Sequence, residues 1–338
     1  MKNYIALGLI LLSSLVSFGQ TNAPVKKLNV VTTLPVLRDI AAQVGGEWVL
    51  VQSLAEPNQD AHFVQPKPTL IKKAAVADVF IEVGMSLELW GQKIIDAAGN
   101  TKIQTGQPGR VITSNGVDMM EIPLVLSREF GDVHPNGNPH IWLDPINVKK
   151  MAVNIYDGFV RVDPTHQEAY QKNLEAYQKK IDEALFGSEL LKIVGSKKLT
   201  RLCEQGNLIK YLEEKKLISK LGGWLKKSEN LRGKKVVTYH RTWAYFANRF
   251  GFKVLAEIED KPGIPPSIRH RDEVVALMNQ NNVRTILMEI FYDRVPAEYI
   301  AKKAAGKIVQ VPIDVGALPQ AGTYIDFIGY ILAQLSKT

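Results

Sequence analysis

Histidine is the residue type in this sequence best suited to binding a metal ion, and three of the six histidines lie in predicted loops beside regular elements. His62 follows a predicted strand, His140 precedes a long helical pattern, and His240 directly follows the apolar run at 236–239. Neutral imidazole is the commonest nitrogen ligand of zinc in proteins. The spacings between the three are long, however, and no compact zinc motif is present. The residues alone therefore leave metal binding open against ordinary hydrogen-bonding roles.

Short β-branched runs alternate with helical periodicity in both halves of the chain, which predicts an α/β fold with mainly parallel sheets flanked by helices. Ligands of such sheets bind beyond the carboxyl ends of the strands. His62 and His240 lie at two such ends, one in each half. The predicted strands are 28–33, 48–54, 79–83, 111–113, 235–238, 253–256, 285–289 and 307–311, and the predicted helices between them are 37–44, 69–77, 87–98, 242–250, 267–279, 296–305 and 324–335.

The two halves are separated by residues 146–185, whose pattern is helical and is interrupted at Asp163-Pro164. Apolar residues recur every three or four positions after this break, so we expect one helix over about 164–185, roughly 33 Å long. Such a helix can join two lobes as a stiff strut. The predicted organisation is a signal peptide at 1–19, a first lobe at 27–145, a helical region at 146–187 that includes the strut, a small helical insertion at 188–231, and a second lobe at 232–338.

The amino-terminal residues 1–19 combine a basic start, an apolar run and small residues near Gly19, which is typical of a secretory signal. Cys203 is the single cysteine, so neither a disulfide within the chain nor a cysteine-based zinc site is expected. It is far from the signal, so no lipid-acceptor cysteine is seen. We therefore expect a periplasmic protein.

The net charge of +8 comes from 42 basic and 34 acidic residues. The basic residues of 210–227 and 232–235 are interleaved with Glu and Leu, which is typical of solvated helix faces. Nucleic acid is therefore not an expected partner.

Several motifs extend this interpretation. They are Asp60-Ala61-His62, Gln65-Pro66-Lys67-Pro68, 77–84, 87–90, 131–135, 137–145, Tyr239-His240-Arg241-Thr242-Trp243 and 261–267. Taken together, in their order and spacing, they resemble those of the substrate-binding receptors of zinc and manganese ABC transporters, across nearly the whole chain after the signal. The resemblance implies two α/β lobes joined by a long rigid helix, with one metal ion in the cleft between them. It also implies a monomeric receptor, not an enzyme, that delivers the ion to a membrane permease.

On this resemblance His62, His140 and His240 are metal ligands, and Asp314, in the loop after the last strand, is the expected fourth. Glu259, Glu289 or water remain alternatives to Asp314. His134 is a candidate accessory ligand, because it lies close to His140 in the sequence.

Each imidazole ligand needs a hydrogen-bond acceptor for its second ring nitrogen. Asp60 and Asp144 are the residues that the sequence suggests for this role.

Three imidazoles and one carboxylate suit Zn²⁺ better than an oxygen-preferring ion, with Mn²⁺ as the next candidate. Two interpretations from other classes remain. A zinc hydrolase would need an open coordination position and a general base such as Glu289. A receptor for a metal chelate, such as haem or a siderophore, would need an aromatic or arginine-lined cleft.

Overall fold

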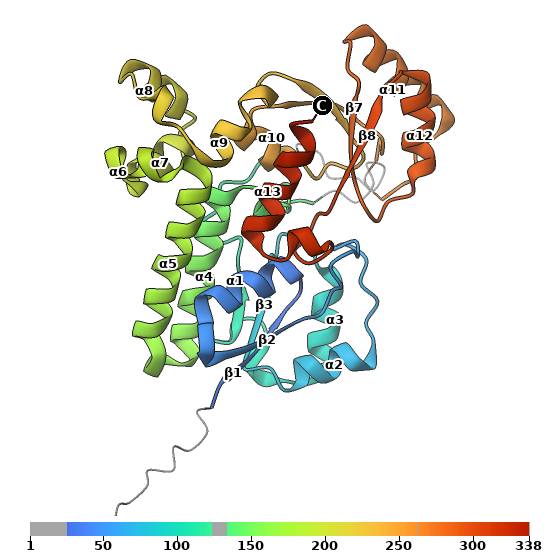
Figure 1. The fold of residues 1–338 in the computed structure, drawn as a ribbon. Coiled ribbons are helices and arrows are strands. Elements are labelled where there is room, and N and C mark those ends of the chain that lie inside the picture. Colours follow the sequence, from blue (N-terminus) through green and yellow to red (C-terminus); the bar gives the residue numbers. More distant parts are fainter. Residues whose placement is uncertain (1–25, 124–133, 262, 338) are drawn as a thin grey trace, which may run out of the picture.

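The computed structural model describes residues 26–123, 134–261 and 263–337. It contains two four-stranded parallel sheets, with strand orders β2-β1-β3-β4 and β6-β5-β7-β8. Each sheet carries helices, and the two lobes lie one above the other in Figure 1. The predicted fold class is thereby confirmed. The predicted export signal at 1–19 lies outside the described residues. None of the described helices is long and apolar enough to cross a bilayer.

The first lobe is built on four strands of β-branched and apolar residues. In the central strand β3, all four residues are buried, as expected of a strand covered on both faces. The first loop that carries a histidine runs from β2 to α2. The elements are β1 Leu28–Thr32, α1 Pro35–Gly45, β2 Val49–Ser53, α2 Pro68–Ala75, β3 Val79–Glu82, α3 Leu89–Ala98 and β4 Arg110–Ile112.

The second lobe repeats this plan, and its central strand β5 ends two residues before His240. A register shift in the β5–β6 ladder falls between Val236 and Val237. The elements are β5 Lys235–Thr238, α10 Ala244–Phe250, β6 Lys253–Glu257, α11 Ile268–Gln280, β7 Thr285–Glu289, α12 Arg294–Lys303, β8 Lys307–Val311 and α13 Tyr324–Leu335.

Two antiparallel helices, α4 (Pro145–Val162) and α5 (Gln167–Phe186), run along one side of the molecule, beside α1 and the first sheet (Figure 1). The strut helix predicted over about 164–185 begins slightly later. Residues Pro164–His166 form a single 3-10 turn, and the Asp163 carboxylate accepts hydrogen bonds from the Tyr170 hydroxyl and His166 Nδ1. The helix α5 buries its predicted apolar stripe against α1 and α4. Four short helices follow: α6 Ser188–Val194, α7 Ser196–Glu204, α8 Leu208–Glu214 and α9 Gly223–Lys227.

The carboxyl-terminal helix α13 connects the lobes directly, since it lies over α1 of the first lobe (Figure 1). The Asp39 carboxylate of α1 accepts a 2.9 Å hydrogen bond from the Tyr324 backbone N–H at the start of α13. The Tyr324 hydroxyl donates to the Trp142 carbonyl, and the Trp142 indole donates to the Ile313 carbonyl. These contacts hold the loop after β8 against the first lobe.

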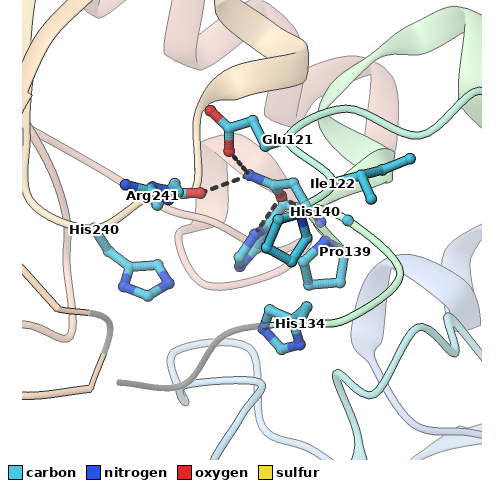
Figure 2. A pocket seen from close by; sticks show the side chains of 10 residues that line it. Glu121, Ile122, His134, Pro139, His140, His240 and Arg241 are labelled. Atoms are coloured by element: carbon cyan, nitrogen blue, oxygen red, sulfur yellow. Dashed lines mark hydrogen bonds between the residues drawn. The ribbon is translucent and has the colours of Figure 1, made fainter. Parts of the chain in front are cut away.

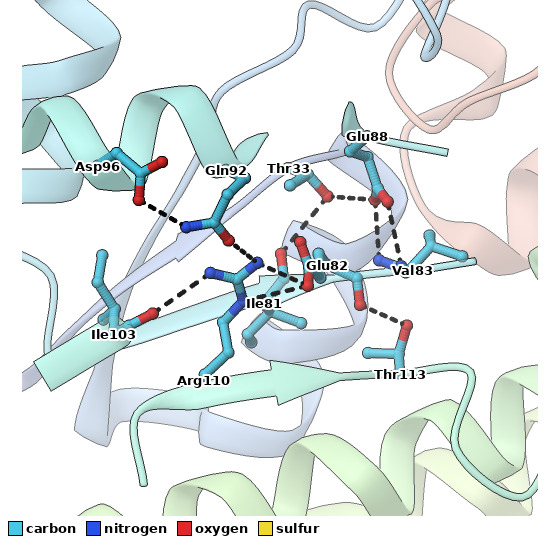
Figure 3. Close-up of polar contacts among 11 residues, drawn as sticks. Thr33, Ile81, Glu82, Val83, Glu88, Gln92, Asp96, Ile103, Arg110 and Thr113 are labelled. Atoms are coloured by element: carbon cyan, nitrogen blue, oxygen red, sulfur yellow. Dashed lines mark hydrogen bonds and ion pairs between the residues drawn. The ribbon is translucent and has the colours of Figure 1, made fainter. Parts of the chain in front are cut away.

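A buried carboxylate closes the loop after β3, on the edge of the first sheet that faces the second lobe (Figure 3). Glu88 accepts hydrogen bonds from the Thr33 hydroxyl and the Val83 backbone N–H on Oε1, and from the Gly84 N–H on Oε2. Gly84 has φ +86°, a conformation that favours glycine. One side chain thus satisfies two backbone donors of a tight turn and ties it to the end of β1.

This carboxylate predicts a pH-dependent stability. Burial, together with the nearby Glu82 carboxylate, raises the pKa of Glu88 to about 7 from 4.5. Between these two pH values the folded chain holds a proton that the unfolded chain has lost, so the free energy of unfolding falls as pH rises from about 4.5 to 7. In Glu88→Gln this dependence should be weaker, because the contribution of Glu88 is lost while other buried carboxyls with a raised pKa, such as Asp314, keep theirs. Urea unfolding of both chains at pH 5 and 7 measures it, and an equal pH slope in the two would contradict the assignment.

Candidate metal centre

His62, His140 and His240 converge between the two lobes, although they are separated by up to 178 residues in the sequence. One ring nitrogen from each can be chosen so that the three atoms all lie within 4.8 Å of one another. The ring centroids of His62 are 5.3 Å from His140 and 5.4 Å from His240. His62 comes from the loop after β2, His140 from the turn before α4, and His240 from the loop after β5. The site is therefore built where the carboxyl ends of the two sheets meet.

Each of the three rings is held by a hydrogen bond on Nδ1. His62 Nδ1 lies 2.8 Å from Asp60 Oδ1, and His240 Nδ1 lies 2.7 Å from Glu259 Oε2. His140 Nδ1 lies 2.9 Å from the side-chain oxygen of Asn138. Because these partners accept, each neutral ring carries its proton on Nδ1 and keeps the lone pair on Nε2 for a ligand. Such outer partners are what orient metal-binding imidazoles in proteins.

The expectation for Asp60 is confirmed as a hydrogen bond, whereas the one for Asp144 is wrong. The Asp144 carboxylate caps α4 by accepting from the Ile146 backbone N–H, and it forms a two-point ion pair with Arg249. Asn138 serves His140 in its place. A signal for this was in the sequence, since an Asx residue stands two positions before both His62 and His140. Its side-chain oxygen can accept from the backbone N–H two residues on, and here it also accepts from the ring.

Electrostatics favour the uncharged form of His140. Burial, and then the neighbouring His62 and His240 rings, hold the pKa of His140 well below its usual value. Burial alone would raise the pKa of Asp60, but its hydrogen bonds with His62 hold that pKa below the usual range. A neutral imidazole beside an ionised carboxylate is a strong nitrogen donor, so the arrangement is suited to a cation.

Asp314 lines the same small cavity as the three histidines but is not part of the tight group of ring nitrogens. Within the part of the chain that the structure describes, its carboxylate accepts hydrogen bonds on Oδ1, from the Val36 N–H at 2.6 Å and the Val315 N–H at 2.7 Å. Val36 is in the first turn of α1, which has no cap from its own N-cap residue. Burial raises the pKa of Asp314 to about 8. Asp314 therefore caps a helix of the opposite lobe from within the cavity wall.

The alternatives for a fourth ligand are placed less favourably. Glu259 is engaged by His240, and it also accepts from the Gly263 N–H at 3.3 Å. Glu289 is fully buried and accepts from the Trp243 indole at 3.1 Å, and it is not among the described residues that line the cavity.

His134 is close to the group, with its Nε2 3.1 Å from Nε2 of His62. Since Nε2 of a neutral His62 accepts, a neutral His134 donates to it.

The cavity between the three histidines has a free volume of about 10 Å³, which is the size of a single water molecule or ion. Aromatic side chains of Trp142, Phe291 and Tyr292 complete its wall. A wider cavity of about 370 Å³ lies beside it and shares His140 and His240. Figure 2 shows the rings of His134, His140 and His240 facing one shared space. The nitrogen atoms thus converge on a space for one ion, with an open approach on one side.

Comparison with protein families gives a match over most of the chain. The family described as ZnuA, zinc-uptake complex component A, periplasmic, matches residues 30–185 and 207–338. The chain belongs to this family. Its members are metal-binding, substrate-binding proteins of ABC transporters. They are solute-binding receptors and not enzymes. The unmatched segment 186–206 contains the helices α6 and α7.

The curated relatives bind different metals. The chain is 27% identical over 318 residues to the iron-binding protein YfeA of Yersinia pestis, covering 92% of this chain and 86% of that one. It is 25% identical over 289 residues to the zinc-binding lipoprotein AdcA of Streptococcus pneumoniae, covering 83% of this chain. It is 32% identical over 162 residues, 47% of this chain, to the manganese ABC transporter substrate-binding lipoprotein PsaA of Streptococcus anginosus. The chain spans about half the length of the two streptococcal relatives, 49% in each case.

Solved structures agree on the fold. A ZnuA deletion mutant with zinc bound has a TM-score of 0.68 at 18% identity, over 92% of this chain and 97% of that one. A Mn-bound periplasmic metal-binding protein from Candidatus Liberibacter asiaticus has a TM-score of 0.66 at 20% identity, over 92% and 99%. At these identities the likeness establishes the two-lobe architecture.

Proposed function

We propose that this chain is an extracytoplasmic receptor that captures one divalent cation, Zn²⁺ first among them, and delivers it to the permease of an ABC transporter. The observation that carries the proposal is the convergence of three Nδ1-anchored imidazoles on a one-ion cavity. In this proposal His62, His140 and His240 bind the ion through Nε2, and Asp314 supplies the fourth, anionic ligand. Export through the predicted signal and a monomeric state belong to the same proposal.

Zinc is favoured over manganese and iron by the chemistry of the donors. Three imidazole nitrogens and one carboxylate oxygen form a closed four-coordinate set, which is typical of zinc, whereas manganese prefers more oxygen ligands and a higher coordination number. The names of the relatives include all three metals, so the choice rests on the donor set of this chain.

The donor set also separates the receptor from its rivals. Glu289, the residue that a zinc hydrolase would need as a base, is packed against Trp243 and lies outside the cavity wall. A haem or siderophore would need more room than the space on which the three nitrogens converge. Among the described residues that line the wider cavity beside it, Arg241 is the single arginine and histidines are the only aromatic rings, so that cavity is not the aromatic or arginine-lined cleft that a chelate would need. Visible absorbance of protein purified from its host would indicate such a chelate.

A competition for the site tests the choice of metal. We expect purified apoprotein, incubated with equimolar Zn²⁺, Mn²⁺ and Fe²⁺ under nitrogen, to retain one zinc per chain after desalting. Elemental analysis measures all three metals in the same sample. Retention of manganese or iron in preference to zinc would overturn the metal assignment but not the receptor, and retention of no metal would overturn both.

A further inference from the structure

His140 is attached to both lobes through one side-chain amide, that of Asn138. The Asn138 side-chain oxygen accepts from the His140 backbone N–H at 3.0 Å and from ring Nδ1 at 2.9 Å. Its Nδ2 donates to the Arg241 carbonyl at 2.7 Å and to Glu121 Oε2 at 2.8 Å. An amide has two donors and two acceptor positions, so all four are used. A flipped amide would place its NH₂ against the His140 backbone N–H and its oxygen against the Arg241 carbonyl and the Glu121 carboxylate, which assigns the orientation.

The bond to Arg241 crosses between the lobes. Asn138 precedes α4, whereas Arg241 directly follows His240 in the loop after β5. Tyr245 of α10 strengthens the same junction, since its hydroxyl donates to the Asn138 carbonyl at 2.9 Å and accepts from the Met120 N–H at 3.1 Å. Of the three ring partners, Asn138 is the one that also bonds to the opposite lobe within the described residues.

Glu121, which accepts a hydrogen bond from Asn138 at this junction between the lobes, is in a strained backbone conformation. Glu121 has φ +55°, which is uncommon for a residue with a side chain. Such strain persists where the surroundings hold it, and it concentrates at ligand-binding sites. Glu121 lines the wider cavity together with Arg241 and His140, and Figure 2 shows it on the opposite side of that cavity from His134.

We propose that Asn138 is a positioning residue, which holds the His140 and His240 rings in register across the two lobes before the metal arrives. The inference rests on the proposed function. Holding ligands in the bound geometry removes an ordering cost from binding, so loss of the junction should appear as lost affinity. Asn138 would not touch the ion and would act through His140.

The variant Asn138→Asp tests this role because it keeps an acceptor for the His140 ring but removes the donor to Arg241 and Glu121. It also places a carboxylate beside the Glu121 carboxylate. We expect zinc affinity, measured by chelator competition, to fall by about 10–100-fold, the range found when outer partners of metal-binding histidines are changed. Adding Glu121→Gln to the same chain exchanges amide and carboxylate, restores one hydrogen bond, and should recover part of the affinity.

Asn100 provides a matched control. Its Oδ1 accepts from the backbone N–H of Lys102, two residues on, and its Nδ2 donates to the Ala74 and Ala77 carbonyls at 2.9 and 2.8 Å. It therefore makes the same pattern of bonds away from the histidines. Asn100→Asp should lower the melting temperature of the apoprotein without changing zinc affinity.

The outcomes separate the two proposals. If the unmodified chain binds no zinc, manganese or iron, the proposed function fails. If it binds zinc and Asn138→Asp binds equally well, or if Asn100→Asp loses as much affinity, the positioning role is overturned. Should Asn138→Asp not fold, Glu121→Gly decides, because glycine accepts the positive φ and only the contact is lost. A weaker affinity in that variant supports the junction, and an unchanged one overturns it.

Discussion

Replacing His240 by alanine should reduce zinc affinity by more than about 100-fold, because it deletes a metal ligand and not only an outer partner, for which 10–100-fold is usual. His62→Ala should have an effect of the same size. The two residues come from different lobes, so each variant removes a ligand from a different side of the cleft. Chelator competition at pH 7.5, with elemental analysis of the retained metal, measures both losses.

The control for these two variants is His166→Ala. His166 Nδ1 also contacts a carboxylate, Asp163 Oδ2 at 2.6 Å, and its ring stacks on Trp48 at 4.0 Å. It lies beyond the far end of α4 from His140, about 27 Å away by the length of that helix. This variant should bind zinc like the unmodified chain. Unchanged zinc affinity in either His62→Ala or His240→Ala would contradict the assignment of a three-histidine metal site.

The sequence was sufficient to predict the regular elements because local patterns determine them. All eight strands and the helices between them lie within a few residues of their predicted bounds, since most of the strands are apolar runs with β-branched residues, bounded by turn residues. The strut helix was the less accurate case. Pro164 follows Asp163, whose carboxylate binds two side chains downstream, and the helix begins only after a 3-10 turn.

The hydrogen bonds that orient the histidine rings were only partly predictable. The predictable ones join residues close together in the sequence, and the others join residues far apart. Asp60 and Asn138 each stand two residues before their histidine, so a local turn brings acceptor and ring together. Glu259 is 19 residues from His240 and reaches it because its backbone N–H bonds to the Tyr239 carbonyl as β6 extends along β5. No local pattern shows such a contact.

Asp314 illustrates the limit most clearly, because its role as a helix cap depends on a contact that no local pattern predicts. Its contact with Val36 joins residues 278 positions apart. The cap does not use the whole carboxylate, since the described hydrogen bonds fall on Oδ1 while the side chain lines the cavity. A variant that removes only the charge can therefore separate them.

Asp314→Asn is expected to weaken zinc binding substantially while leaving the apoprotein at least as stable at pH 7.5. The amide keeps an acceptor oxygen for Val36 and Val315, so the cap survives. Burial raises the pKa of Asp314 to about 8 from 3.8. The folded chain therefore holds a proton between these pH values that the unfolded chain loses, which lowers stability as pH rises and which asparagine abolishes. A bound cation, by contrast, loses the one anionic ligand that partly neutralises it. Urea unfolding and chelator competition on the same preparation measure both quantities.

Asp39 supplies the control, because it caps a helix of the other lobe just as Asp314 does. Asp39 accepts a hydrogen bond from the first turn of α13, and Asp314 accepts one from the first turn of α1. Asp39 is not among the described residues that line the cavity. Asp39→Asn should leave zinc affinity unchanged. Asp314→Ala should lose zinc affinity as well, and its apoprotein should also lose about 1 kcal/mol of stability, the usual effect of removing a cap.

If Asp314→Asn binds zinc like the unmodified chain while Asp314→Ala is destabilised, Asp314 is a cap alone. The fourth position would then belong to His134 or water, and His134→Ala would distinguish them, because a water ligand survives that change whereas a fourth imidazole does not.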